Sequence, residues 1–213
     1  MKNTTKNRWP DGPGSVCRAA LVSAALMLSG STLPAGANTL NLDFTYTVVQ
    51  GTCQIDVSPV PVTFGDVTDL STAIGKDWVV LNQKTLTVTL SACDGAGDAS
   101  TQPAIELKGQ RANDSGASND RQNSVFTSDN KTGLGVVFAN KDSQSTLSKS
   151  NLLAYDTAKG GMFIYTDVAG QKATNKAYSI RTGLSCGTAA DCAANKLSVA
   201  SGAATVTFSF TYR

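Results

Sequence analysis

Histidine is absent from the 213-residue sequence. A Ser-His-Asp or Cys-His nucleophile therefore cannot be assembled, and the side chain that most often serves as a general base is missing. The acidic pair Asp66 and Asp69 could in principle share acid-base work, but acidic residues this close together beside a strand are usually solvated turn residues. We therefore expect a protein that is not an enzyme and has no catalytic residue.

The spacings of common metal and phosphate sites are also missing. Asp114, Asp120 and Asp129 lie in a segment rich in amides, but no DxDxDG calcium loop occurs there. Gly160 and Gly161 are not followed by the residues of a phosphate-binding loop, and the pair is typical of a turn. The sequence therefore predicts neither a metal nor a cofactor.

No apolar run is long enough to remain in a membrane. The longest candidate, residues 19–28, is much shorter than the roughly 20 residues of a membrane-spanning helix. Four basic residues precede it: Lys2, Lys6, Arg8 and Arg18. Pro34 and the small-x-small pattern of residues 35–37 follow it, as in a cleaved export signal. We expect residues 1–37 to be a signal peptide and the mature chain to begin at Asn38.

Strong net charge is missing from the mature chain. Removal of residues 1–37 leaves 176 residues with 14 basic and 15 acidic side chains, a net charge of about −1. No basic cluster provides the electrostatic footprint of a nucleic-acid-binding protein. We therefore expect no nucleic-acid partner, and a chain of a size to form one core or one core with a small appendage.

Four cysteines stay in the chain after Cys17 leaves with the signal, and an even number in an exported protein indicates disulfides. Cys53 and Cys93 each end a strand-like run, so we expect them to pair and to staple the first two strands. Cys186 and Cys192 flank a short polar turn, which favours a second, local disulfide. A zinc site is the competing interpretation, but the pairs lack CxxC spacing and no histidine is available.

Alternation with a period of two residues, the signature of β-strands, covers most of the chain. The clearest cases are residues 40–48, 85–91 and 204–212. Shorter candidates are residues 60–64, 78–81, 104–107, 134–138, 161–165 and 178–182. Residues 109–131 are polar and lack alternation, so we expect a surface loop there. Many short strands without helical segments between them predict an all-β, antiparallel sandwich of one domain.

At this point the chain resembles the pilin subunits of chaperone-usher fimbriae, of the type 1 fimbria-like family. An alternating arm at residues 38–49 precedes Cys53, and Cys93 closes the pattern Leu-x-Val-x-Leu-x-x-Cys-Asp that begins at Leu86. The last strand ends with a penultimate tyrosine, Tyr212. The resemblance extends over essentially all of residues 38–213.

The resemblance implies an incomplete immunoglobulin-like sandwich that a donor strand from outside completes. Residues 38–52 would be the donor-strand extension and residues 53–213 the pilin domain. The donor side chains would be Leu40, Leu42, Phe44, Tyr46 and Val48. The groove that accepts a chaperone strand or the next subunit's arm would be lined or bordered by Ala204, Val206, Phe208, Phe210 and Tyr212.

The implied function is that of a structural fimbrial subunit that polymerises by donor-strand exchange and contributes to adhesion. Its implied partners are a periplasmic chaperone, an outer-membrane usher, neighbouring pilins and a host receptor reached through the fibre. Its destination would be the cell-surface fimbrium, reached through the periplasm.

Tyr46 departs from the family pattern, which usually has glycine seven residues before the first cysteine. This departure points to a specialised neighbour and leaves open a minor tip or adaptor subunit, or a carbohydrate-binding adhesin of the same fibre. Tip adhesins of this system normally carry a receptor domain ahead of the pilin domain and lack the donor arm, whereas this chain has the arm. An ordinary complete sandwich, in which Tyr212 is only a core aromatic, is a further alternative.

Overall fold

The computed structural model describes residues 39–46, 53–67, 69–95, 99–113, 115–128, 132–198 and 202–213, with the backbone alone for residues 39–46. The segment Ala35–Arg213 forms one compact unit. The predicted signal peptide, residues 1–37, and the predicted donor residue Val48 lie outside the described residues. None of the helices in the described part of the chain has the length and apolar character needed to cross a membrane.

Strands dominate the described residues, which confirms the prediction of an all-β protein. The strands are β1 (Thr39–Tyr46), β2 (Gln54–Ser58), β3 (Val62–Asp66), β4 (Leu81–Ser91), β5 (Pro103–Gly109), β6 (Gly135–Phe138), β7 (Met162–Tyr165), β8 (Lys176–Ser185) and β9 (Gly202–Tyr212). The helical elements are α1 (Asn119–Ser124) and two 3-10 turns, η1 (Lys149–Asn151) and η2 (Ala194–Lys196).

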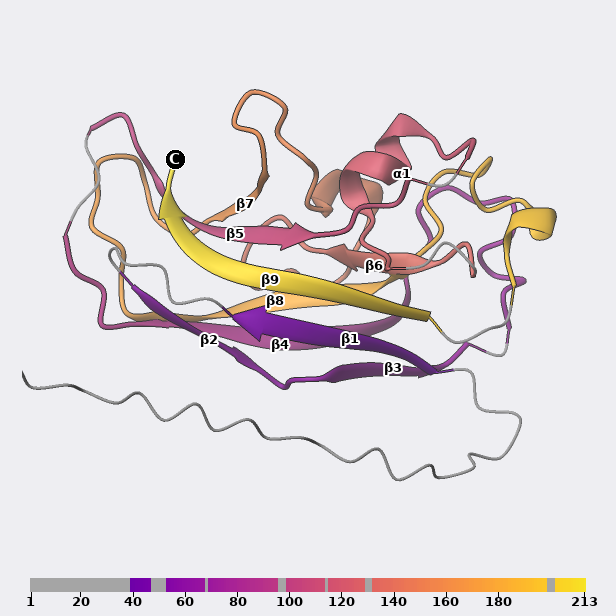
Figure 1. Ribbon diagram of the computed structural model, residues 1–213, viewed down its shortest axis with the longest axis horizontal. Coiled ribbons are helices and arrows are strands. Elements are labelled where there is room, and N and C mark those ends of the chain that lie inside the picture. The colour runs from indigo at the N-terminus through magenta and orange to yellow at the C-terminus, as the bar shows by residue number, and fades with distance from the viewer. Residues whose placement is uncertain are drawn as a thin grey trace, which may run out of the picture. The chain divides into compact units, whose positions relative to one another are not determined.

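The strands form two sheets (Figure 1). One has the order β3-β1-β9-β5-β7 and the other the order β2-β4-β8-β6. Neighbouring strands pair antiparallel throughout, except that β1 runs parallel to β9. The long strand β9 curves beside β1 and β5, so the first described strand and the last are direct neighbours.

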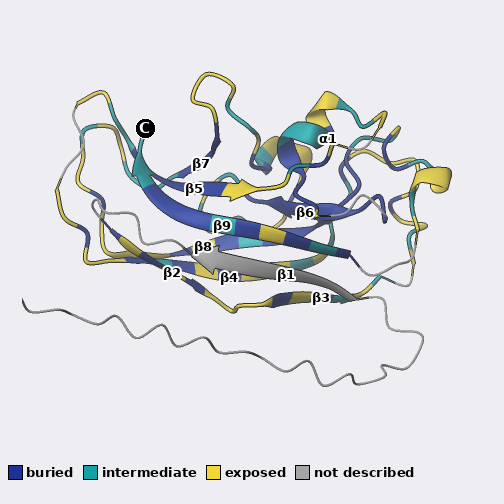
Figure 2. Cartoon of the chain, viewed as in Figure 1, coloured by how far each residue is buried: buried dark blue, intermediate teal, exposed yellow. Residues whose placement is uncertain are grey.

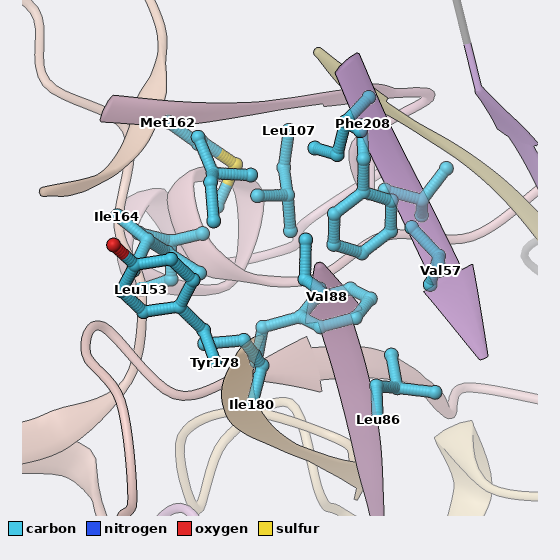
Figure 3. Close-up of a cluster of buried hydrophobic side chains, with 14 of the residues drawn as sticks. Val57, Leu86, Val88, Leu107, Leu153, Met162, Ile164, Tyr178, Ile180 and Phe208 are labelled. Atoms are coloured by element: carbon cyan, nitrogen blue, oxygen red, sulfur yellow. The ribbon is translucent and has the colours of Figure 1, made fainter. Parts of the chain in front are cut away.

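The core lies between the sheets because the alternation of apolar residues turns one face of each strand inward. Ile55 and Val57 on β2 are buried, as are Leu86 and Val88 on β4, whereas Thr87 between the latter two is exposed (Figure 2). Figure 3 shows side chains of both sheets meeting in one cluster. Fully burying an aliphatic or aromatic side chain of this kind contributes about 1.5–3 kcal/mol, so this cluster is the main source of stability.

Most of the predicted strands exist, but residues 78–81 do not form one. Only Leu81 belongs to a strand, and Trp78 has a φ of 51° in a turn. Trp78 is nevertheless buried, in a second cluster with Val137 and Leu147, and its backbone N–H donates to the Gly187 carbonyl at 2.7 Å. The apolar run therefore reflects burial of a loop, which alternation alone does not distinguish from a strand.

The prediction of a plain surface loop at residues 109–131 is also wrong. Ser118 caps α1 by accepting a hydrogen bond from the Arg121 N–H at 3.1 Å. Val125 and Phe126 follow the helix and are buried, and the Phe126 ring meets Phe138 edge-on with 5.7 Å between centroids. Two apolar residues directly after the helix thus pack the segment against the core.

Candidate assembly interface

Strand β1 fills the space between β3 and β9. Its backbone pairs in parallel with β9 from Leu40 opposite Gly202 to Tyr46 opposite Phe208. On its other side β1 pairs antiparallel with β3, where Leu42 lies opposite Val62, and the register shifts between Thr39 and Asn41. Strand β1 therefore joins β3 to the rest of its sheet.

The sheet order shows which strands depend on β1 for backbone hydrogen bonds. Strand β3 has β1 as its hydrogen-bonded neighbour within this sheet, and β9 has β5 on the side opposite β1. Without β1, the β9 edge over residues 202–208 and the facing edge of β3 would both lose their backbone partners. A row of unpaired N–H and C=O groups of this kind is a template for pairing with another strand.

The predicted groove residues of β9 share one face, which is turned into the core. Ala204, Val206, Phe208 and Phe210 are buried, and Tyr212 is half-buried. The Phe208 ring packs edge-on against Phe138 across the core, with 5.8 Å between centroids. Strand β1 lies beside β9 in the same sheet, and Val206 and Phe208 are at positions paired with β1.

Both the hydroxyl and the ring of Tyr212 make contacts that hold the side chain in place. Its hydroxyl accepts a hydrogen bond from the Ala173 N–H at 3.2 Å and donates to the Gly95 carbonyl at 3.3 Å. Its ring meets Phe210 edge-on at 5.4 Å. Tyr212 therefore attaches the end of β9 to two loops, a role that needs no contact with β1.

The predicted donor residues Leu40, Leu42, Phe44 and Tyr46 all lie within β1, each opposite a β9 residue. Their side chains are outside what the structure describes, so the assignment of these side chains as donors stays a prediction. The register places Tyr46, the departure from the family pattern, opposite the fully buried Phe208.

A buried carboxylate holds the outer face of this sheet together near the C-terminal end of β9. Glu106 on β5 is only 4% exposed, and its carboxylate lies 3.1 Å from the Lys108 ammonium and 3.7 Å from the Arg213 guanidinium. The Arg213 guanidinium also lies over the Phe163 ring, 5.2 Å from its centroid. A buried carboxylate needs such partners, because desolvation without them is costly.

Both predicted disulfides are present, Cys53–Cys93 and Cys186–Cys192. In the chain-entropy model, loops of 40 and 6 residues give about 4 and 2 kcal/mol. The first disulfide joins the residue before β2 to the end of β4, which are neighbours in their sheet, so the prediction that it staples the first two strands is wrong. With all four cysteines in disulfides, the zinc alternative is excluded for them.

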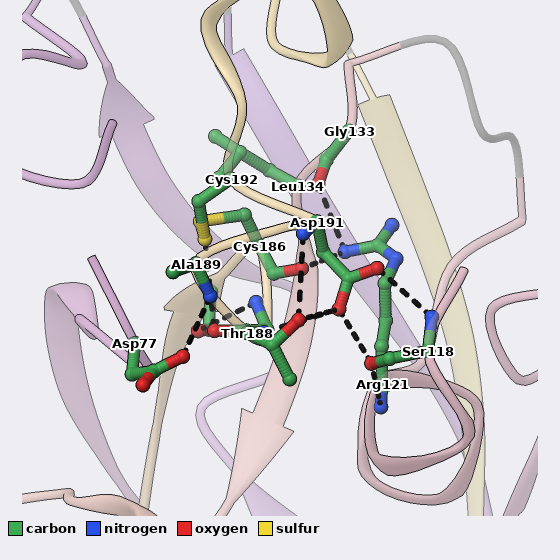
Figure 4. The surroundings of a disulfide bond; sticks show 12 residues. Asp77, Ser118, Arg121, Gly133, Leu134, Cys186, Thr188, Ala189, Asp191 and Cys192 are labelled. Carbon is green, nitrogen blue, oxygen red and sulfur yellow. Dashed lines mark hydrogen bonds between the residues drawn. A yellow bond between two sulfur atoms is a disulfide. The ribbon is translucent and has the colours of Figure 1, made fainter. Parts of the chain in front are cut away.

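The Cys186–Cys192 loop is held by Asp191, which is 4% exposed (Figure 4). Its carboxylate accepts hydrogen bonds from the Ser118 N–H at 2.9 Å and the Ser118 hydroxyl at 2.5 Å. It also accepts from the Thr188 N–H at 3.1 Å and the Thr188 hydroxyl at 2.6 Å. Burial alone would raise the pKa of Asp191, but these hydrogen bonds outweigh it and hold the pKa below its usual value.

Arg121 extends the same network from α1. It is 1% exposed, and its guanidinium donates to the carbonyls of Gly133 at 2.9 Å and Cys186 at 2.5 Å. Gly187 has a φ of 105°, and a Cβ there would lie about 3.0 Å from the Asp191 carboxylate and 3.1 Å from the Arg121 Cβ. The loop, the helix and the disulfide therefore form one rigid unit at the end of β8, which the sequence analysis missed because its residues are far apart in the chain.

Asp191→Asn is expected to lower the free energy of unfolding at neutral pH by about 1.5–3 kcal/mol, because the amide cannot accept all four hydrogen bonds. The pKa of Asp191 is lower in the folded protein than in the unfolded chain, where it is about 4. The ionised carboxylate therefore stabilises the fold above about pH 4, and this contribution disappears as the pH falls through the folded-state pKa. The difference in the free energy of unfolding between wild type and Asp191→Asn, measured by urea denaturation, should therefore be constant above about pH 5 and shrink below about pH 4. Asp120→Asn, which removes an exposed ion pair with Lys149, should change stability by less than about 1 kcal/mol. A difference that persists unchanged to the lowest pH would contradict this account of Asp191.

The two acidic residues Asp66 and Asp69 have separate local roles. Asp69 accepts a hydrogen bond from the Ser71 N–H at 2.8 Å, and hydrogen bonds from Ser71 lower its pKa. Asp66 ends β3. Within the described residues, no group of three or more cysteine, aspartate and glutamate side chains is arranged to hold a metal ion.

Comparison of the chain with protein-family models and with curated proteins finds no match.

Proposed function

We propose that this chain is a structural subunit of a chaperone-usher fimbria, in which β1 is the strand donated from one subunit to the next. The observation that carries the proposal is the position of β1 between β3 and β9. It is the first strand that the structure describes, and it occupies a place that a strand of a second copy could occupy equally well.

The physical basis of assembly is exchange of an identical element between copies. When the same strand makes the same backbone contacts within one chain or between two, the bonds lost and gained are alike, and such exchange requires little free energy. Backbone pairing then provides affinity, and alternate side chains in pockets provide register. Burial of five donor side chains offers about 8–15 kcal/mol at roughly 1.5–3 kcal/mol each, enough for a persistent non-covalent fibre.

The finer description of the fold follows from this proposal. Without β1, the strands β2, β4, β8 and β6 face β3, β9, β5 and β7, and we describe this remainder as an incomplete immunoglobulin-like sandwich. A subunit whose own β1 occupies the acceptor position has to release it before a neighbour's strand can enter. A periplasmic chaperone would supply the strand in the interval, and an outer-membrane usher would be the place of exchange.

The remaining parts of the proposal concern location and position in the fibre. Two disulfides fit an oxidising compartment outside the cytoplasm, which supports export through the periplasm to the cell surface. A place as a minor tip or adaptor subunit is the second candidate, and Tyr46 opposite Phe208 supports it, because a glycine-type pocket would have no room for a tyrosine. Adhesion to a host receptor would then be a property of the assembled fibre.

Strand exchange can be tested with a labelled peptide of residues 38–49 added to the purified chain. We expect slow uptake of the peptide into a complex that stays intact on an unheated denaturing gel, because the peptide replaces β1 in the same place. A matched peptide with Leu42→Asn and Phe44→Asn should not be taken up, since polar side chains would then face the groove. Equal uptake of both peptides would show that side-chain register plays no part, and uptake of neither would count against exchange of β1.

A further inference from the structure

A hollow of about 130 Å³ opens between the C-terminal part of β5 and the turn that leads into β7. Leu107, Phe126 and Met162 line it, and each of the three is at most 2% exposed. These side chains therefore form its inner, apolar wall. Arg111 also lines it, and we call this space the Arg111 hollow.

Two glycines form the wall on the side of the turn. The N–H groups of Gly160 and Gly161 both donate to the Asp156 carbonyl, at 2.8 and 3.2 Å, which closes the turn. Gly160 has a φ of 70°, and a Cβ at Gly161 would lie 2.4 Å from the Phe163 ring. Side chains are thus disfavoured at both positions, and the hollow stays open on this side.

The Arg111 side chain is held in place by two contacts. Its guanidinium lies over the Tyr155 ring, 3.9 Å from the centroid, and its Nη1 donates to the Asn123 side-chain oxygen at 3.2 Å. The Tyr155 N–H in turn donates to the Asn123 backbone carbonyl at 2.8 Å. A guanidinium has five N–H donors in one plane, so a fixed Arg111 keeps further donors for a ligand.

The charges around the Arg111 hollow favour an anion. Glu106, the acid in its lining, already has two cationic partners, Lys108 at 3.1 Å and Arg213 at 3.7 Å. The Asp156 carboxylate accepts hydrogen bonds from backbone N–H groups of its own turn. Among the residues that the structure describes, no carboxylate forms an ion pair with Arg111. The lining therefore has two cations against one acid, and the Arg111 guanidinium is the cation without an acidic partner.

Size and chemistry together indicate the class of ligand. The volume is close to the roughly 150 Å³ of a cavity that accommodates benzene. A guanidinium fork matches the two oxygens of a carboxylate, and apolar side chains match a ring without polar groups. We propose that the Arg111 hollow binds a small organic acid, with the carboxylate on Arg111 and a compact apolar ring against Leu107, Phe126 and Met162. This site is independent of strand exchange.

The test titrates benzoate into the full purified chain and follows the amide chemical shifts. We expect a Kd below about 10 mM, with shifts of the Arg111, Gly160 and Met162 amides. Benzamide has the same ring without the charge, and formate has the charge without the ring. Each should bind at least about tenfold more weakly than benzoate, because each lacks one of the two matched parts.

Arg111→Ala should weaken benzoate binding by at least about tenfold, since it removes the cation that the carboxylate contacts. Arg181→Ala is the matched control and should leave the Kd unchanged. Arg181 is also half-buried, and its guanidinium donates to the Gln144 carbonyl at 3.0 Å. The comparison of benzoate, benzamide and formate uses the wild-type chain, so the test stays decisive if Arg111→Ala fails to fold.

Four outcomes would overturn the proposal. The first is absence of benzoate binding, and the second is binding that Arg111→Ala leaves intact. Benzamide that binds as tightly as benzoate would show a site for an uncharged ring. Formate or inorganic phosphate that binds as tightly as benzoate would show an anion site to which the apolar wall contributes nothing.

Discussion

Deletion of residues 38–47 is expected to leave a subunit that accepts an incoming strand but cannot donate one. The deletion removes β1, so the β9 edge over residues 202–208 and the β3 edge lose their partners, while the disulfides and the main core stay in place. Mixed with an epitope-tagged intact chain, the deleted chain should appear only as a terminal unit in the ladder of multimers on an unheated denaturing gel. By itself it should form no ladder and should need an added strand to stay in solution.

The control for this deletion is Asp43→Ala. Asp43 occupies one of the polar positions of the alternating arm. The substitution should therefore leave the rate of multimer formation and the largest multimer size within about twofold of wild type. A normal ladder formed by the deleted chain alone would reject donor-strand exchange as the function of this protein. Loss of the ladder in Asp43→Ala to the same extent would instead show that alternation of the arm does not determine its register.

Cysteines at positions 43 and 205 are expected to lock the subunit against assembly. Asp43 and Thr205 are partners in the parallel ladder between β1 and β9. Adjacent strands lie about 4.8 Å apart, within the range of Cα separations that a disulfide spans. After oxidation, the Asp43→Cys, Thr205→Cys chain should form no multimers, because β1 can no longer leave its own domain. Mild reduction should restore the ladder, since the native cysteines are buried whereas Thr205 is exposed.

The matched control is Asp43→Cys alone, which has no partner on β9 and should assemble as wild type does. Mass spectrometry of the oxidised double variant gives the fraction with the intramolecular bond. Multimers that form at the wild-type rate from fully cross-linked chains would show that release of β1 is not required. Cross-links between neighbouring chains in the fibre would show that an exchanged strand keeps the parallel register seen within one chain.

Much of the β-structure was predictable because its cause is local. Alternation at residues 85–91 and 204–212 depends on which side of a strand each side chain takes, and this follows from backbone geometry alone. The same reasoning failed at Trp78, where an apolar run is buried as a loop, and for α1, whose six residues are too few for a helical period. Burial tells which residues are inside, but it does not tell which backbone conformation puts them there.

The candidate sites depended on contacts that no local pattern contains. The Arg111 guanidinium lies over the Tyr155 ring although the two residues are in separate segments of the chain. Likewise, the Asp191 carboxylate accepts a hydrogen bond from Ser118, which is far away in the sequence. The pairing of Cys186 with Cys192 was predictable, since the two cysteines flank one turn. The network of Asp191 and Arg121 around them was not, because a hydrogen bond between distant residues leaves no spacing to recognise.

By itself, the sequence determined the all-β class, most of the strands, both disulfide pairs and the presence of an alternating strand at each end of residues 38–213. These properties follow from the side-chain period, from the short turn that Cys186 and Cys192 flank, and from the position of Cys53 and Cys93 at the ends of strand-like runs. Only the tertiary structure decided that β1 lies between β3 and β9, that it runs parallel to β9, and that Tyr46 lies opposite Phe208. Strand pairing is a choice among many edges of similar local chemistry, and it is settled by which arrangement buries the apolar faces and pairs the backbone of the whole domain at once.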